Sequence, residues 1–209
     1  ADDLTAFWEN ALALREAVRD VPPGRWDAST FHDPASNDPG RTTGRRGGYL
    51  DEPIAFDPAS FGIMPRTVEG GEPEQFLVLD AARSALADAG LLDRMPDRRR
   101  VEVVVGRGNY FNRGNLTRLQ HGRVLEQTLA ILRSLHPEWT DADLTAARDD
   151  LRSCLPPFEA ATIPGQLTNA TAGRLADRFD LAGASFVVDA ASASALVALD
   201  LGARALTSR

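Results

Sequence analysis

One stretch of the sequence decides the fold: Val187-Val188-Asp189-Ala190-Ala191-Ser192-Ala193-Ser194-Ala195-Leu196-Val197-Ala198-Leu199. It predicts a buried strand that ends at Asp189, a sharp turn of small residues, and a helix from Ser192 to Leu206. A reactive side chain at Ser192 would stand on this turn, at the N-terminus of the helix, where the helix dipole favours negative charge. The alanines around it would let the backbone turn tightly and would leave room for a substrate.

Helical and strand patterns are mixed along the rest of the chain. The first helix should end before Pro22-Pro23-Gly24, and residues 27–48 have the composition of a long surface loop. Long crossovers between strands favour an α/β fold with a parallel or mixed sheet. The predicted helices span residues 4–18, 74–89, 116–135, 140–155 and 165–179, and the predicted strands span residues 101–105 and 184–189.

Composition and charge exclude several classes of protein. The chain has 209 residues, of which 43% are hydrophobic, enough for one sizeable core or two lobes. The net charge of −7 argues against nucleic-acid binding, and we interpret Arg98-Arg99-Arg100 as a solvated loop rather than a phosphate site. No apolar run is long enough to span a membrane, and the first residues lack the pattern of a signal peptide. We therefore expect a cytoplasmic protein without membrane contact.

The single cysteine, Cys154, cannot form an internal disulfide, which fits a reducing compartment. It precedes two prolines at a helix end, and we expect a small buried or partly buried side chain. No group of residues has the spacing of metal ligands.

Several blocks of the sequence, in order, resemble the ketosynthase domains of fatty-acid and polyketide synthases. They cover nearly the whole chain, and the position of Ser192 is that of the family's nucleophilic cysteine. The blocks are Phe7-Trp8-Glu9-Asn10, Val21-Pro22-Pro23-Gly24-Arg25-Trp26, Phe56 to Arg66, Glu72-Pro73-Glu74-Gln75, the helix end at Ala87-Asp88-Ala89-Gly90, Gly173-Arg174, and Leu181 to Leu199.

The resemblance implies a thiolase-like fold in which residues 1–209 are the N-terminal portion of one ketosynthase domain. The family's first strand would precede Ala1, and the half that supplies two catalytic histidines and a lysine would follow Arg209. None of His32, His121 and His136 stands in a family catalytic motif, so we expect surface or loop residues. Asp189 and Arg174 are expected to be structural.

A long insertion resembles iterative synthases, such as those that make polyunsaturated fatty acids and glycolipid chains. It comprises Gly106 to Asn115, the helix that follows, and Leu135-His136-Pro137-Glu138-Trp139. These segments are unusual for modular polyketide ketosynthases.

The activity implied by the resemblance is decarboxylative Claisen condensation of acyl and malonyl thioesters. Substrates would arrive on the phosphopantetheine arm of an acyl carrier protein, with no cofactor held by the chain itself. A homodimer and other domains of a multidomain synthase are the further partners implied. In the family, the strand that leads to the nucleophile pairs across the twofold axis of the dimer.

Serine at position 192 changes this chemistry, because a hydroxyl needs a general base where a thiol is readily ionised. We expect acyl transfer to Ser192 to be severely impaired. An engineered exchange of cysteine for serine and a natural departure are both compatible with the sequence. The natural alternative is a module that decarboxylates, or one that only binds acyl carriers.

Three other interpretations of these motifs remain at this point. Ser192 could be a helix N-cap, which serine favours. Gly106-x-Gly108 could begin a dinucleotide-binding loop, although Phe111 stands where the third glycine belongs. A serine hydrolase would need glycine two positions either side of its nucleophile, but Ala190 and Ser194 occupy those positions.

Overall fold

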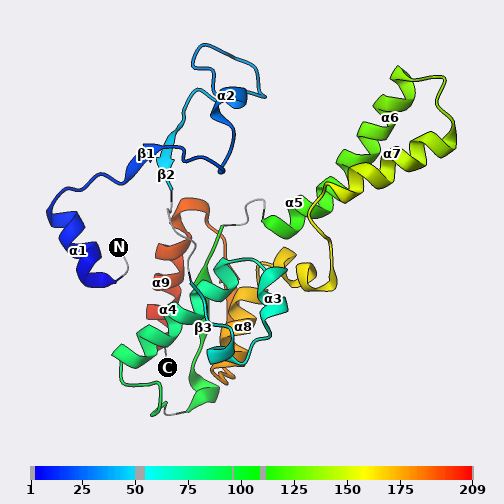
Figure 1. The fold of residues 1–209 in the computed structure, drawn as a ribbon. Helices are drawn as coiled ribbons and strands as arrows, with labels where there is room; N and C mark the ends of the chain where they lie inside the picture. The colour runs from blue at the N-terminus through cyan, green and yellow to red at the C-terminus, as the bar shows by residue number, and fades with distance from the viewer. Residues whose placement is uncertain (1–2, 50–54, 96, 109–111, 209) are drawn as a thin grey trace. The chain divides into compact units, whose positions relative to one another are not determined.

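The computed structural model describes residues 3–49, 55–95, 97–108 and 112–208. The chain forms two compact units, Ala1–Ala55 and Phe56–Arg209 (Figure 1). Leu50, expected in an extended segment, and Asn109 to Phe111 of the insertion lie outside the described residues.

The first unit contains one longer helix and a short antiparallel ribbon. Helix α1 (Leu4–Leu12) is capped by Asp3, whose Oδ1 accepts a hydrogen bond from the backbone N–H of Ala6 at 2.7 Å. The predicted continuation of this helix to Val18 is wrong. Leu14 takes a left-handed backbone conformation (φ 50°), and β1 (Val18–Asp20) pairs with β2 (Arg46–Gly48). Sheet pairing across the unit therefore overrides the local helical pattern.

The predicted long loop holds some regular structure. A short helix, α2 (Ala28–Phe31), begins after Asp27, and β2 closes the segment. Hydrogen bonds from the hydroxyls of Ser29 and Thr30 lower the pKa of Asp27 to about 2. The carboxylate is therefore ionised over the physiological range and caps α2 there.

The second unit is built around two parallel strands. Strand β3 (Val103–Gly106) pairs with β4 (Ser185–Val188), with Val103 opposite Ser185 and Gly106 opposite Val188. Helices α8 and α9 both contact this strand pair, and α4 packs on α8. The helices and turns of the core are η1 (Ala59–Phe61), α3 (Pro65–Glu69), α4 (Glu74–Asp88), η2 (Arg98–Arg100), η4 (Ala160–Gln166), α8 (Ala170–Arg178), η5 (Ala191–Ala193) and α9 (Ser194–Thr207).

The core of this unit lies where α4, α8 and the strands meet. Its buried hydrophobic residues are Ile63, Phe76, Leu79, Val103, Ala172 and Leu175. The predicted helix 74–89 is confirmed as α4, and Gly90 takes the left-handed conformation (φ 66°) that follows such a helix. The predicted helix 165–179 is instead divided between η4 and α8.

Residues 113–153, which contain most of the inserted segment and the helix after it, form a helical hairpin (Figure 1). Its first arm runs through α5 (Arg113–Leu119), a wide π-helical turn (Gln120–Val124) and α6 (Leu125–Leu135). Its second arm is α7 (Asp141–Ser153), which begins with a capping box between Thr140 and Asp143 and matches the predicted helix 140–155. Ion pairs join the two arms, Arg133 with Asp141 and Arg148 with Glu126.

The predicted basic loop is a short 3₁₀ turn, η2, fixed to its neighbours. The Arg98 guanidinium donates to the backbone carbonyl of Phe179, and Arg99 pairs with Asp97. Among the described residues, no helix is both long and apolar enough to cross a membrane.

The core can be tested by truncating Leu79, which is fully buried. We expect Leu79→Ala to lower the free energy of unfolding by about 2–5 kcal/mol, because it leaves a cavity between α4 and the strands. Urea denaturation followed by circular dichroism measures the change. Leu135→Ala is the matched control, since Leu135 is 67% exposed, and its effect should stay within about 0.5 kcal/mol. Equal losses in the two variants would contradict this core assignment.

Candidate active site

The candidate site is the turn that joins β4 to α9. Strands β3 and β4 run parallel, so their carboxyl ends lie at the same edge of the sheet. The backbone N–H of Arg107 donates to the carbonyl of Val188 at 3.0 Å and extends the pairing one step past β3. The chain then leaves the sheet at Asp189 and enters η5.

The turn contains a backbone conformation that L-residues rarely adopt. Ala191 has a φ of 49°, directly before Ser192. The carboxylate of Asp189 accepts a hydrogen bond from the Ala191 N–H at 3.0 Å. Asp189 therefore has the structural role expected of it, because its side chain fixes the first residue of η5.

Ser192 lies inside η5, two residues before α9 begins, and is exposed. Its hydroxyl makes no hydrogen bond within the part of the chain that the structure describes. The N-cap interpretation of Ser192 is therefore wrong, because the cap position of α9 belongs to Ala193 and no side chain caps it. The side chain at position 192 is thus exposed next to the N-terminus of α9.

Ser194 is the site residue that sequence reasoning missed. Its Oγ accepts a hydrogen bond from the N–H of Ala190 at 2.9 Å and donates one to the carbonyl of Ala191 at 2.6 Å. Only 5% of the residue is exposed. The only signal in the sequence was a second serine among alanines, two positions after Ser192.

Gly106 allows the start of α9 to approach the end of β3 closely. A Cβ at this position would lie 2.3 Å from the carbonyl oxygen of Ser194 and 2.7 Å from the N–H nitrogen of Ala195. Both are backbone atoms, so the neighbours could not yield by rotating a side chain. This contact explains the glycine after β3 without a dinucleotide-binding loop.

A polar layer joins this edge of the sheet to α4 and α8. The guanidinium of Arg107 donates to Glu74 on α4, and to the hydroxyl of Thr171 on α8 at 3.1 Å. Its Nε is buried and has no hydrogen-bond partner among the described residues. Arg107 thereby links the two helices that pack beside the end of β3.

Arg174 has the structural role expected of it. Its Nε donates to the buried amide oxygen of Gln75 at 3.1 Å, and its guanidinium lies 4.9 Å from the centre of the Phe76 ring. Burial, and secondarily repulsion from Arg178, lowers the pKa of Arg174. The Gln75 amide also donates to the carbonyl of Pro164, which ties α4 to η4.

The histidines and the cysteine stand away from this turn in the sequence. Nε2 of His121 lies 2.7 Å from the carbonyl oxygen of Pro156, and the ring of His136 stacks on Trp139. His121 belongs to the π-helical turn rather than to a loop. Cys154 is exposed at the end of α7, so the expectation of a buried side chain is wrong. Among the described residues, no group of acidic, histidine or cysteine side chains could hold a metal ion.

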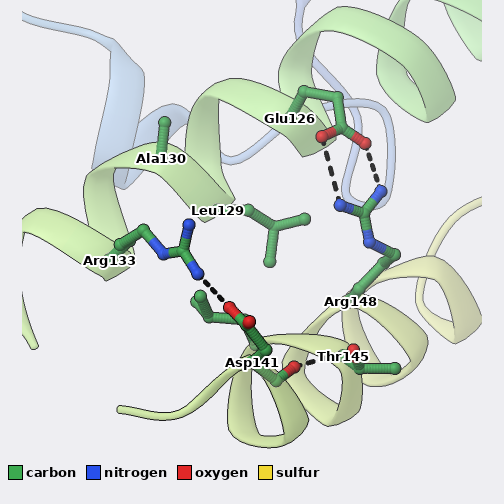
Figure 2. Close-up of a pocket in the computed structure, with 8 residues that line it drawn as sticks. Glu126, Leu129, Ala130, Arg133, Asp141, Thr145 and Arg148 are labelled. Carbon is green, nitrogen blue, oxygen red and sulfur yellow. Dashed lines mark hydrogen bonds and ion pairs between the residues drawn. The ribbon is translucent and has the colours of Figure 1, made fainter. Parts of the chain in front are cut away.

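A separate hollow of about 470 Å³ lies between the arms of the hairpin (Figure 2). Leu129 and Leu144 are among its lining residues, and the two interhelical ion pairs stand at its sides. None of its lining residues belongs to the turn that carries Ser192.

Comparison with known proteins identifies the family. The family profile described as "Beta-ketoacyl synthase, N-terminal domain" matches residues 1–209. The chain belongs to the β-ketoacyl synthase family. The solved oxazolomycin ketosynthase domain of Streptomyces albus JA3453 is similar over the whole of this chain and 31% of its own, with a TM-score of 0.69 and 27% identity. The fold is therefore the thiolase-like fold of the ketosynthases, as the sequence predicted.

The curated relatives of this ketosynthase chain are large synthases. It is 29% identical over 208 residues to a phenolphthiocerol/phthiocerol polyketide synthase of Mycobacterium tuberculosis, which is 100% of this chain and 11% of that protein. It is also 29% identical over 199 residues to a polyunsaturated fatty acid synthase of Thraustochytrium sp., which is 92% of this chain and 7% of that protein. The chain thus spans a small part of each relative. A synthase of the polyunsaturated type is among them, as the inserted segment led us to expect.

The contact at Gly106 can be tested with two glycine substitutions. We expect Gly106→Ala to destabilise the ketosynthase chain by about 1–3 kcal/mol or more, because the added methyl group would push the start of α9 away from β3. Gly202→Ala is the matched control, since a Cβ on this glycine of α9 meets no atom within 4 Å. It should leave stability unchanged or raise it by up to about 1 kcal/mol. Urea denaturation of both variants measures the free energy of unfolding, and an unchanged value for Gly106→Ala would disprove the close contact.

Proposed function

We propose that this chain is the N-terminal portion of one ketosynthase domain, and that position 192 is the acyl acceptor of the complete domain. The reaction is decarboxylative Claisen condensation in polyketide or fatty-acid assembly. The observation that carries the proposal is the exposed side chain at position 192, which the turn after β4 presents beside the N-terminus of α9.

The reaction divides into two steps at this position. In the first, the side chain at 192 attacks the thioester carbonyl of an acyl carrier, forms an acyl ester, and releases the carrier thiol. In the second, a malonyl thioester loses CO₂, and the resulting carbanion attacks the carbonyl of that ester. The new carbon–carbon bond forms as the bond to residue 192 breaks. The family resemblance assigns the histidines that assist these steps to the part of the domain that follows residue 209.

Ser192 makes the first step slow in this chain. A serine hydroxyl stays protonated near neutral pH and needs a general base, and its hydroxyl has no hydrogen-bonding partner among the described residues. The dipole of α9 contributes on the order of 1 kcal/mol, or up to about 2 kcal/mol in a partly buried site, which is too little to form an alkoxide. We therefore infer that Ser192 stands where an active ketosynthase has cysteine, and that the exchange inactivates condensation.

The partners follow from the same proposal. Acyl and malonyl groups arrive on the phosphopantetheine arm of an acyl carrier protein, and the chain itself holds no cofactor. A homodimer and the other domains of a multidomain synthase complete the assembly, which works in the cytoplasm. Exposed apolar side chains on α9 support a covering partner there, since Leu196, Leu199 and Leu206 are 71%, 70% and 85% exposed.

The decisive variant is Ser192→Cys in the complete synthase. We expect it to gain an acyl adduct at position 192 and to condense acyl and malonyl carriers at least about 100-fold faster than the serine form, because a thiolate needs no general base. Intact-mass and peptide mass spectrometry detect the adduct, and chromatography of the extended product measures condensation. Ser192→Ala should neither gain an acyl adduct at position 192 nor condense the two carriers. Cys154 serves as an internal control for non-specific acylation.

A second function is favoured by the unassisted hydroxyl of Ser192. The natural protein would then be a module that only docks acyl carriers, or one that removes CO₂ from malonyl groups without condensing them. If the Ser192→Cys variant binds acyl carrier protein but neither acylates nor condenses, the condensing function is rejected. Release of CO₂ from malonyl carrier by the serine form would then identify the decarboxylase.

A further inference from the structure

The turn before Ser192 holds a conformation that it would not keep unaided. Ala191 has a φ of 49°, where a Cβ is crowded by the neighbouring carbonyl, and no glycine is present to relieve it. Such conformations persist where surrounding contacts over-determine them, and they cluster at functional sites. The question is which contacts hold this one.

Side chains bond three backbone groups at Ala190 and Ala191. Asp189 accepts from the N–H of Ala191 at 3.0 Å. The Ser194 hydroxyl takes the other two, because it accepts from the N–H of Ala190 and donates to the carbonyl of Ala191. One hydroxyl therefore spans the Ala190–Ala191 pair as a clamp, from the N–H of Ala190 to the carbonyl of Ala191, with its proton and one lone pair in use.

Ser194 is itself held in place. The residue is 5% exposed, and its carbonyl oxygen lies against the backbone of Gly106, 2.3 Å from where a Cβ would stand. Its own backbone is helical (φ −53°, ψ −43°), as the first residue of α9. The clamp is thus anchored on one side to α9 and on the other to the end of β3.

We propose that Ser194 is a positioning residue, whose hydroxyl keeps Ala191 left-handed and thereby directs the side chain at position 192 outward at the N-terminus of α9. The inference rests on the proposed role of position 192 as the acyl acceptor. Without the clamp, Ala191 would relax toward negative φ, and the side chain at 192 would lose its fixed orientation to the helix dipole.

The test measures the reactivity of a thiol at position 192, in the full 209-residue chain carrying Ser192→Cys. Iodoacetamide alkylates the chain over a range of pH, and peptide mass spectrometry gives the rate at position 192 relative to that at Cys154. We expect Ser194→Ala to lower this ratio about 3- to 10-fold at about pH 7 and to move the half-maximal rate at position 192 to higher pH, since the helix N-terminus favours the thiolate. Ser134→Ala, an exposed serine on α6, should leave both unchanged.

A rescue separates positioning from mere stability. Glycine adopts positive φ without the crowding of a Cβ, so Ala191→Gly added to Ser194→Ala should restore at least half of the lost ratio. Ser194→Thr keeps the hydroxyl and should hold the ratio within about twofold of Ser194. If Ser194→Ala does not fold, the double variant with Ala191→Gly takes its place, and its ratio should match that of the Ser192→Cys parent within about twofold.

Two results would overturn the proposal. One is an unchanged ratio and pH profile in folded Ser194→Ala. The other is a loss that Ala191→Gly fails to restore, which would mean that Ser194 only stabilises the start of α9. Alkylation needs neither an acyl carrier nor condensation, so these results stand whether or not the Ser192→Cys synthase condenses.

Discussion

The contact between the end of β3 and the start of α9 governs the geometry of this chain. Gly106 has no side chain, so the carbonyl of Ser194 comes to lie directly against the strand. The two strands end opposite each other, at Gly106 and Val188. The start of α9 therefore lies close to the end of β4 as well, and only residues 189–193 connect them. The connection therefore has to be tight, and the left-handed Ala191 is how the backbone achieves it.

The polar groups near this edge join its helices and strands to one another. Arg107 bridges Glu74 and Thr171, and Arg174 is held by Gln75 against the ring of Phe76. Each of these bonds joins two elements distant in sequence, so the helices around the strands cannot shift independently. An exposed side chain such as that of Ser192 gains a fixed orientation only from the backbone that carries it, so these contacts bear on the geometry of the turn.

Local signals predicted much of this fold. The strand before Gly106, the helix that ends before Gly90 and the helix 140–155 were each predicted from a short stretch of sequence, and the structure confirms them. The predicted end of α1 failed because Val18 pairs with Gly48, a partner thirty residues away that no local pattern reveals. The prediction that the Cys154 side chain is buried or partly buried was also wrong, because the exposure of a residue at a helix end depends on which other elements pack against it. The place of Ser192 on the turn was predicted from the strand–turn–helix pattern, whereas its assignment to the nucleophile position came from the family resemblance alone. The hydrogen bonds of Ser194 depend on the orientation of its hydroxyl, which no sequence pattern predicts.

The wide turn at Gln120–Val124 has a consequence for the inserted hairpin. A π-helical turn accommodates about one residue more than an α-helix would over the same stretch. Each residue added to a helix rotates everything after it by about 100°. The extra residue therefore shifts the phase of α6 relative to α5, and buried residues occur on both sides of the turn: Thr117 before it, Leu125 and Leu129 after it. The first arm is thus two helical segments whose relative phase differs from that of one uninterrupted α-helix, so the turn decides which side of α6 continues the buried side of α5.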